Sequence, residues 1–429
     1  MKIEELYKIY RQSRLVSTDS RKISPGSIFF ALKGENFNGN QFALQAIEQG
    51  ALAAIVDEEP AVPHTSIYRV DDALTTLQEL AAFHRKQMGI PILAITGSNG
   101  KTTTKELCKA VLSKKFNVYA TTGNLNNHIG VPLTLLAMND QVELGIVEMG
   151  ASHPGEIRNL CAIAYPDMGV ITNVGKAHLE GFGSLEGVAR AKGELFEHLR
   201  ANHKTIFIND GNEYVRKLVP DSYFPVIHYN SERGPRVISK KSNPFLELGI
   251  DVSNQNYLLK TNLLGGYNAE NILAAFCIGT QMGVSPGDIK DAIESYKPQN
   301  NRSQFIESGK NRLFMDAYNA NPSSMFAAVD EFLLTGEDKK LLILGEMLEV
   351  GDSSYKEHKA LVDHLKEKQV KLAICIGKSF ESAVTGTGYA YYETVGQLIL
   401  HLKDHPLAGQ YILIKGSRAN KLEKLLEVL

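Results

Sequence analysis

The chain has 429 residues, of which 43% are apolar, and its 46 Lys and Arg against 48 Asp and Glu give a formal charge of −2. A single hydrophobic core does not usually grow to this length, so about two to four domains are expected. The balanced charge provides no basic surface for nucleic acid or for anionic lipid, and neither partner is expected.

The cysteines and the longest apolar runs argue against three further kinds of protein: zinc-binding, disulfide-rich and membrane-spanning. The four cysteines, Cys108, Cys161, Cys277 and Cys375, lie far apart and form neither a zinc motif nor a disulfide framework. No apolar run approaches the roughly 20 residues that a membrane-spanning helix needs. We therefore expect a cytoplasmic protein that does not insert into a membrane, and a monomer.

The first block of the chain covers residues 1–88. Its apolar pattern predicts strands at 27–32 and 53–56, a helix near 42–48, and a long amphipathic helix over 74–88. These elements predict a small N-terminal α/β domain.

The most informative segment follows an apolar run at 92–96. It is the loop Gly97-Ser98-Asn99-Gly100-Lys101-Thr102-Thr103, and a helix-compatible segment comes directly after it. Such a turn presents backbone N–H groups to a polyphosphate, and its glycines permit close approach. Lys101 adds a mobile positive charge, and the Thr102 hydroxyl can ligate Mg²⁺. The loop therefore predicts ATP or GTP binding, the alternative being a plain turn with a solvated lysine.

The spacing within this loop is shorter than usual. Two residues separate its first glycine from the Gly-Lys pair, whereas the standard phosphate loop has about four. The short spacing disfavours kinases and GTPases and favours a narrower class of nucleotide-binding protein.

Three candidate metal-site residues follow the loop. Glu148 ends a predicted strand, where a Mg²⁺ ligand is needed if that strand lies beside the phosphate strand. His178 follows the end of the next predicted strand. Lys192 lies in a predicted helix with apolar residues one turn away on either side, which places it on a buried face. Taken singly, each could instead be a solvated or structural residue.

Short apolar runs between helical segments predict parallel sheets in the second and third blocks. The polar stretch 297–301 separates these blocks, so we expect three α/β domains over 1–88, 89–300 and 301–429. The predicted strands are 144–148, 168–172 and 205–208 in the second block, and 341–344, 372–376 and 411–415 in the third.

The motifs at 96–103, 147–150, 173–179 and 191–194 resemble, in order and spacing, those of the Mur ligases. These are ATP-dependent amide ligases of peptidoglycan precursor synthesis, and the resemblance covers essentially the whole chain. It implies a central P-loop-type, mostly parallel sheet with helices on both faces. It also implies a Rossmann-like α/β C-terminal domain and a small α/β N-terminal domain.

The resemblance implies a catalytic apparatus as well. Thr102 and Glu148 would hold one Mg²⁺, and His178 would help to hold a second. Lys192 would be carbamylated by CO₂ and so become an anionic metal-binding group, while Lys101 and Arg302 would stabilise the phosphates. The residues implied to bind ATP are Gly97, Ser98, Asn99, Gly100, Lys101, Thr102, Thr103, Asn271, Arg302, Asp316 and Tyr318.

Two runs, 123–134 and 316–325, resemble the branch of the family that adds D-alanyl-D-alanine to UDP-N-acetylmuramoyl-tripeptide through an acyl phosphate. The N-terminal domain would bind the UDP-sugar, the central domain ATP, and the C-terminal domain ATP and the dipeptide. Tyr267 departs from the family pattern, which usually has His there. The residues implied to bind the substrates are Ser20, Arg21, Lys33, Asn38, Asn124, Asn126, Asn127, Asn319 and Asn321.

Two other functions remain open on the sequence. The nearer alternative is a ligase that adds another amino acid to a muramoyl peptide, or glutamate to folate. The more distant one is a P-loop kinase or a nucleotide-switched binding protein without an amide product. The runs 123–134 and 316–325 argue against the first, and the short phosphate loop argues against the second.

Overall fold

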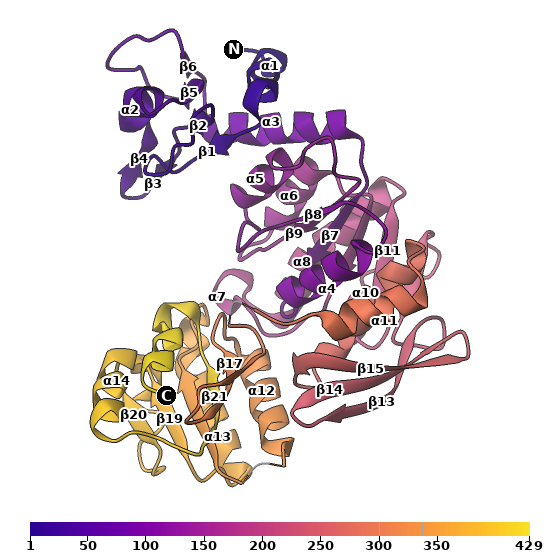
Figure 1. Ribbon diagram of the computed structural model, residues 1–429, viewed down its shortest axis with the longest axis vertical. Coiled ribbons are helices and arrows are strands. Elements are labelled where there is room, and N and C mark those ends of the chain that lie inside the picture. The colour runs from indigo at the N-terminus through magenta and orange to yellow at the C-terminus, as the bar shows by residue number, and fades with distance from the viewer. Residues whose placement is uncertain (300, 337) are drawn as a thin grey trace.

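The computed structural model describes residues 1–299, 301–336 and 338–429. It contains three α/β units, with the N-terminal unit at one end of the molecule and the C-terminal unit at the other (Figure 1). The predicted joint near residue 300 falls on Asn300, which lies outside the described residues.

The N-terminal unit is built on a four-stranded parallel sheet in the order β1-β2-β5-β6. The predicted strands at 27–32 and 53–56 correspond to β2 and β5. Its elements are α1 (Ile3–Ser13), β1 (Val16–Ser17), β2 (Ile28–Phe30), β3 (Lys33–Gly34), β4 (Phe37–Asn38), the 3₁₀ turn η1 (Gly39–Phe42), α2 (Ala43–Glu48), β5 (Ala53–Val56), β6 (Ile67–Arg69) and α3 (Ala73–Met88).

Helix α3 joins this unit to the next one. It begins at Asp72, whose side chain accepts a hydrogen bond from Thr75 N at 2.6 Å, and ends before Gly89 in the left-handed conformation. It packs against α1 on one side and against α5 and α6 of the central unit on another. The predicted amphipathic helix is therefore the bridge between the two units.

The central unit has a six-stranded, fully parallel sheet in the order β12-β11-β10-β7-β9-β8. The phosphate strand β7 lies between β9, which ends in Glu148, and β10, which precedes His178. The elements are β7 (Ile92–Thr96), α4 (Lys101–Leu112), β8 (Val118–Ala120), α5 (Gly130–Leu136), β9 (Leu144–Glu148), α6 (Glu156–Ala164), β10 (Met168–Ile171), α7 (Leu179–Phe182), α8 (Leu185–Ala201), β11 (Thr205–Asn209), α9 (Glu213–Arg216) and β12 (Val226–Tyr229).

A three-stranded antiparallel sheet follows, which the sequence analysis did not predict. It consists of β13 (Arg236–Ser242), β14 (Phe245–Val252) and β15 (Gln255–Leu264), and it leads into α10 (Asn268–Gln281) and α11 (Pro286–Ser295). Leu246, Leu248 and Ile250 alternate along β14 and are buried in the core that α4 and α10 share. This sheet brings α10 against the helix that follows the phosphate loop.

The C-terminal unit has a six-stranded sheet in the order β16-β17-β21-β18-β19-β20, parallel except for β16. The three strands predicted in this unit are β18, β19 and β21. The elements are β16 (Gln304–Glu307), β17 (Arg312–Asp316), α12 (Pro322–Leu334), β18 (Lys340–Gly345), η2 (Gly351–Ser353), α13 (Ser354–Glu367), β19 (Ala373–Ile376), η3 (Lys378–Phe380), β20 (Ala390–Tyr392), α14 (Val395–Asp404), β21 (Tyr411–Lys415), η4 (Arg418–Asn420) and η5 (Leu422–Glu427).

Within the described ranges, the helices are all too short or too polar to cross a membrane.

Candidate active site

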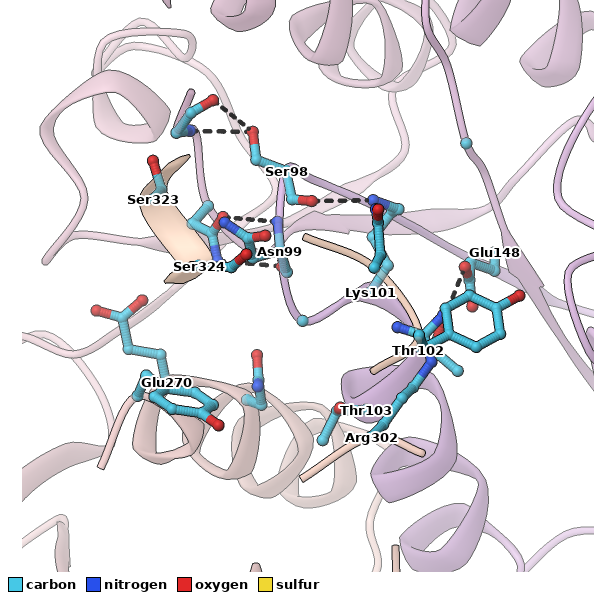
Figure 2. A pocket seen from close by; sticks show the side chains of 18 of the residues that line it. Ser98, Asn99, Lys101, Thr102, Thr103, Glu148, Glu270, Arg302, Ser323 and Ser324 are labelled. Atoms are coloured by element: carbon cyan, nitrogen blue, oxygen red, sulfur yellow. Dashed lines mark hydrogen bonds between the residues drawn. The ribbon is translucent and has the colours of Figure 1, made fainter. Parts of the chain in front are cut away.

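A cavity of about 1080 Å³ lies where the central and C-terminal units meet. The carboxyl ends of the central strands, the phosphate loop and the start of α10 form one wall, and residues of the C-terminal unit form the other. Parallel α/β sheets place ligand sites at this edge. Figure 2 shows the phosphate-loop residues Lys101, Thr102 and Thr103 in this cavity, with Arg302 of the C-terminal unit.

The phosphate loop needs both of its glycines. Gly97 and Gly100 have φ of +145° and +79°, and a Cβ on Gly97 would lie 2.0 Å from Thr172 Oγ1. The Lys101 ammonium donates to Gly97 O at 2.7 Å and to Ser98 O at 3.2 Å, which folds the side chain back over the loop. Burial lowers the pKa of Lys101 below its ordinary value.

Glu148 is the centre of a small polar cluster and is only 1% exposed. Its Oε1 accepts hydrogen bonds from Thr102 Oγ1 at 3.1 Å and from Asn126 Nδ2 at 2.8 Å. Its other oxygen, Oε2, is buried and has no hydrogen-bond partner. An unpartnered carboxylate oxygen beside a threonine hydroxyl is a donor set that suits Mg²⁺, which prefers oxygen ligands and keeps positions for water and phosphate.

His178 and Lys192 both lie near the aromatic ring of Phe182. The ring of Phe182 is 6.2 Å from the His178 ring centroid and 5.1 Å from Lys192 Nζ. His178 Nδ1 lies 2.6 Å from Glu349 Oε2 of the C-terminal unit. Lys192 is fully buried, donates to Ala151 O at 3.0 Å and does not line the cavity itself.

The environment of Lys192 favours its neutral form. Burial first, and the charge of Lys101 second, lower the pKa of the Lys192 amine to about 7. A neutral amine, unlike an ammonium group, has a free electron pair and can act as a nucleophile. The residues described here include no cluster of three His, Cys, Asp or Glu side chains that could hold a metal by itself.

Arg302 and Asp316 both line the C-terminal wall of the cavity. The Arg302 guanidinium lies 3.7 Å from the centroid of the Tyr318 ring, a cation–π contact. Asp316 accepts from Lys415 Nζ at 2.5 Å and from Ser303 N at 3.2 Å.

The predicted nucleotide residue Asn271 packs against the phosphate loop from α10. Its Oδ1 accepts from Thr104 Oγ1 at 3.1 Å, and a Cβ on Gly100 would lie 2.3 Å from that oxygen. Tyr267, the departure from the family pattern, is partly buried, and its hydroxyl lies 3.1 Å from Ser303 Oγ. Burial raises the pKa of Tyr267 well above its ordinary value, with the Asp316 charge as a second cause.

The two walls are joined by direct bonds between units. Lys176 N donates to Ser323 Oγ at 2.9 Å, and Lys176 Nζ pairs with the buried Glu357 at 2.7 Å. Asn321 Nδ2 donates to Asn99 Oδ1 of the phosphate loop at 2.7 Å. The C-terminal unit is therefore closed onto the phosphate loop.

The predicted residues of the N-terminal unit do not line this cavity. Arg21 pairs with Asp19 at 2.8 Å, and Lys33 pairs with Asp57 at 2.9 Å. Asn38 Nδ2 donates to Glu58, and Ser20 is buried. The cationic groups proposed for a diphosphate are thus already matched with carboxylates of their own unit.

Most of the remaining predicted residues come together at the cavity, and a few do not. Asn127 lines it, but its Oδ1 accepts from Ile129 N and Gly130 N at the start of α5, which is a structural role. Those that line the cavity are Ser98, Asn99, Gly100, Lys101, Thr102, Thr103, Asn126, Asn127, Glu148, His178, Asn271, Arg302, Asp316, Tyr318 and Asn319. Those outside its lining are Ser20, Arg21, Lys33, Asn38, Gly97, Asn124, Lys192 and Asn321.

Several lining residues were not singled out in the sequence. Ser152 comes from the loop after β9 and Glu156 from the start of α6, while Lys240 lies on β13 of the unpredicted antiparallel sheet, and Asn230 and Glu270 come before and after that sheet in the chain. The first two follow the recognised strand end and could have been included for that reason. The others carry no motif, because their place depends on how that sheet folds.

Three family profiles match consecutive parts of the chain. They are "Mur ligase family, catalytic domain" over residues 13–92, "Mur ligase middle domain" over 95–279, and "Mur ligase, glutamate ligase domain" over 301–418. The chain belongs to the Mur ligase family. The predicted three-domain Mur ligase fold and the predicted ATP-dependent ligase class are confirmed.

Curated Mur ligases are similar along nearly the whole chain. The UDP-N-acetylmuramoyl-tripeptide–D-alanyl-D-alanine ligase of Bacillus subtilis (strain 168) is 36% identical, covering 96% of this chain and 92% of the relative. The ligase of the same name from Escherichia coli (strain K12) is 34% identical, covering 96% and 93%.

Solved Mur ligase structures agree in fold. A crystal structure of MurF from Acinetobacter baumannii has a TM-score of 0.88 at 30% identity, covering 96% of this chain and 92% of that one. MurF ligase from Thermotoga maritima in complex with ADP has a TM-score of 0.86 at 28% identity, covering 97% of each chain.

Proposed function

We propose that this Mur ligase joins D-alanyl-D-alanine to UDP-N-acetylmuramoyl-tripeptide, forming the pentapeptide with ADP and phosphate. The observation that carries the proposal is the hydrogen bond from Asn126 to Glu148. Asn126 belongs to the run at 123–134 that resembles the dipeptide-adding branch, and Glu148 stands beside Thr102 of the nucleotide site. Relatives at 36% and 34% identity carry the name of this reaction.

The first step activates an unreactive carboxylate. An oxygen of the tripeptide carboxylate attacks the γ-phosphorus of ATP, the bond to the bridging oxygen breaks, and ADP leaves. Lys101 and the loop N–H groups offset charge on the phosphates, and Arg302 approaches them from the opposite wall. The product is an acyl phosphate, in which phosphate has become a good leaving group.

The second step forms the amide. The dipeptide amine attacks the acyl carbon, and the tetrahedral intermediate collapses with release of phosphate and an amine proton. Acyl phosphates hydrolyse in water, so the site must close before the first step. The bonds from Asn321 to Asn99 and from Lys176 to Glu357 support such closure. We place the dipeptide beside Asn319 and Asn321 on the C-terminal wall.

The proposed chemistry uses two Mg²⁺ ions and a carbamate on Lys192. Thr102 and Glu148 would hold one ion, because Glu148 Oε2 is buried without a partner. His178 and carbamylated Lys192, which both lie near Phe182, would hold the second. Bound Mg²⁺ neutralises phosphate charge and polarises the transferred phosphoryl group. The neutral Lys192 amine can add to CO₂ with loss of one proton, and it keeps an N–H for its bond to Ala151.

The division of labour follows the units. We assign residues 1–88 to the UDP-sugar, 89–300 to ATP, and 301–429 to ATP and the dipeptide, in a cytoplasmic monomer. Because Arg21 and Lys33 are paired with Asp19 and Asp57, diphosphate binding by these cations requires them to exchange partners.

The experiment is ATP-dependent phosphate release by the purified chain with UDP-N-acetylmuramoyl-tripeptide, with and without D-alanyl-D-alanine. Release that needs both substrates, with a pentapeptide product by mass spectrometry, is expected. Release with another amine would favour a different amide ligase. A stable phosphorylated product without an amide would favour a kinase.

A further inference from the structure

Lys105 is a buried lysine that the proposed chemistry does not use. It lies on α4 one turn after Thr102, is 1% exposed and does not line the cavity. A buried ammonium group is unfavourable unless its hydrogens are bonded. Its Nζ donates to Thr121 O at 2.6 Å and lies 2.8 Å from Glu106 Oε1.

Thr121, which Lys105 binds, is also bonded to Glu148, the carboxylate proposed to bind Mg²⁺. It follows β8 and is buried, and its Oγ1 accepts a hydrogen bond from the backbone N–H of Glu148 at 3.0 Å. The carbonyl and the hydroxyl of one residue therefore bind α4 and the end of β9 at the same time.

Thr121 also begins the segment 121–128, whose far end returns to the same carboxylate. Asn126 Nδ2 donates to Glu148 Oε1 at 2.8 Å, and Asn126 O accepts from Gly150 N at 2.8 Å. The segment is thus bonded to Glu148 through Thr121 at its beginning and through Asn126 near its end. Lys105 binds the Thr121 end. Residues 126–128 then line the cavity.

We propose that Lys105 is a positioning residue. By holding Thr121, it fixes both the backbone of Glu148 and the segment that presents Asn126, so that the carboxylate faces Thr102. Its bond rather than its charge performs this role, because its ammonium group is separated from the cavity. The inference rests on the proposed function, since Asn124, Asn126 and Asn127 of this segment are among the residues that would bind the UDP-tripeptide.

The test compares Lys105→Met with Lys109→Met, the same change at an exposed position of the same helix. Calorimetry measures ADP affinity with and without Mg²⁺, and steady-state assays give KM and kcat. Removing the donor leaves Thr121 O unpaired in the interior. For Lys105→Met we expect the Mg²⁺-dependent gain in ADP affinity to fall about tenfold, and KM for the UDP-tripeptide to rise about fivefold. ADP affinity without Mg²⁺ and KM for the dipeptide should stay unchanged, and Lys109→Met should match wild type.

A second variant, Thr121→Val, tests the other bond of Thr121, the one with Glu148 N. Thr121→Val removes the acceptor for Glu148 N, so it should also reduce the Mg²⁺-dependent gain in ADP affinity. In the double variant, the fold-loss of this gain should be smaller than the product of the fold-losses in the two single variants. If Lys105→Met does not fold, the same measurements on Thr121→Val test the inference.

Equal loss of ADP affinity with and without Mg²⁺, or wild-type values for Lys105→Met and Thr121→Val, would overturn the inference. A wild-type enzyme that binds Mg·ADP but forms no pentapeptide would overturn the proposed function instead. In that case the calorimetric comparison still decides the role of Lys105.

Discussion

Asn321 donates its side-chain N–H to Asn99 Oδ1 at 2.7 Å, so a residue of the C-terminal unit holds the phosphate loop across 222 positions of sequence. The same side chain accepts from Ser324 N at 2.9 Å and begins α12 as its N-cap. One residue therefore starts a helix and fastens the closed arrangement of the two units.

We predict that Asn321→Asp separates these two roles. Aspartate is as good an N-cap as asparagine, but it cannot donate to Asn99 and adds negative charge near the phosphates. We expect kcat/KM for ATP to fall about 10- to 100-fold while the melting temperature changes by less than about 2 °C. Asn321→Ala is the comparison, because it should lower both quantities. Wild-type kinetics in the aspartate variant would show that the bond to Asn99 is dispensable.

Glu148→Gln keeps the size of the side chain and an oxygen for Thr102 and Asn126, but removes the charge that would bind Mg²⁺. We expect kcat to fall at least about a thousandfold, with ADP binding retained in EDTA. Adding EDTA to wild type should also abolish turnover. Glu143→Gln, an exposed change just before β9, should be neutral. Substantial turnover by Glu148→Gln at ordinary Mg²⁺ concentrations would remove Glu148 from the metal site.

Replacement of Lys192 should abolish activity through loss of the carbamate. We expect Lys192→Ala to be inactive, to be unaffected by bicarbonate, and to be partly restored by small carboxylates that can occupy the vacated space. Wild type supplied with ¹³CO₂ should show a carbamate carbon by NMR that the variant lacks. A fully active Lys192→Ala enzyme would exclude the carbamate role.

His84 makes stability depend on pH at the junction of the first two units. It is buried on α3, its Nε2 lies 2.9 Å from Met138 O, and Tyr7 OH lies 3.1 Å from its Nδ1. Burial lowers the pKa of His84 below its ordinary value, and the charges of Arg14 and Arg11 act in the same direction. Just below about pH 6.5, His84 therefore binds a proton more readily in the unfolded chain than in the folded chain.

The sign of the pH effect follows from this difference. The stability that neutral His84 contributes is fully present above about pH 6.5 and is lost as pH falls toward its folded pKa. Urea unfolding of wild type and His84→Gln should show the gap in unfolding free energy narrowing from pH 7.5 to pH 5.5. A gap that stays constant would mean that His84 does not titrate in this range.

Local pattern was sufficient for the central strands of the two large parallel sheets and for the edge of the central sheet that carries the phosphate loop. The apolar runs at 144–148 and 411–415 coincide with β9 and β21. Glu148 and the strand before His178 flank the phosphate strand because parallel strands with crossover helices can be ordered in few ways. Alternation along β14 was also a readable signal, with a turn at Ser253 and Asn254, both in the left-handed conformation, but it was missed.

Contacts between units could not be predicted in this way. The bond from Asn321 to Asn99 and the pair formed by Lys176 and Glu357 depend on how two separately folded units dock. Neither hydrophobic periodicity nor a sequence motif indicates which residues of two units will come into contact. The pairing of Lys33 with Asp57, which follows β5, was missed for a related reason, whereas Asp19 lies only two positions before Arg21 and was a local signal that was missed.

Helix α3 has a consequence for how the molecule comes apart. Leu6, Tyr10 and Phe30 of the N-terminal unit share one continuous hydrophobic core with Leu77 on α3 and Val147 on β9 of the central unit. The C-terminal unit packs around two other cores, which contain Leu342 and Ile343, and Leu264 of β15 is a buried member of the first. Calorimetric melting should therefore register two cooperative transitions rather than three, with the N-terminal and central units unfolding together.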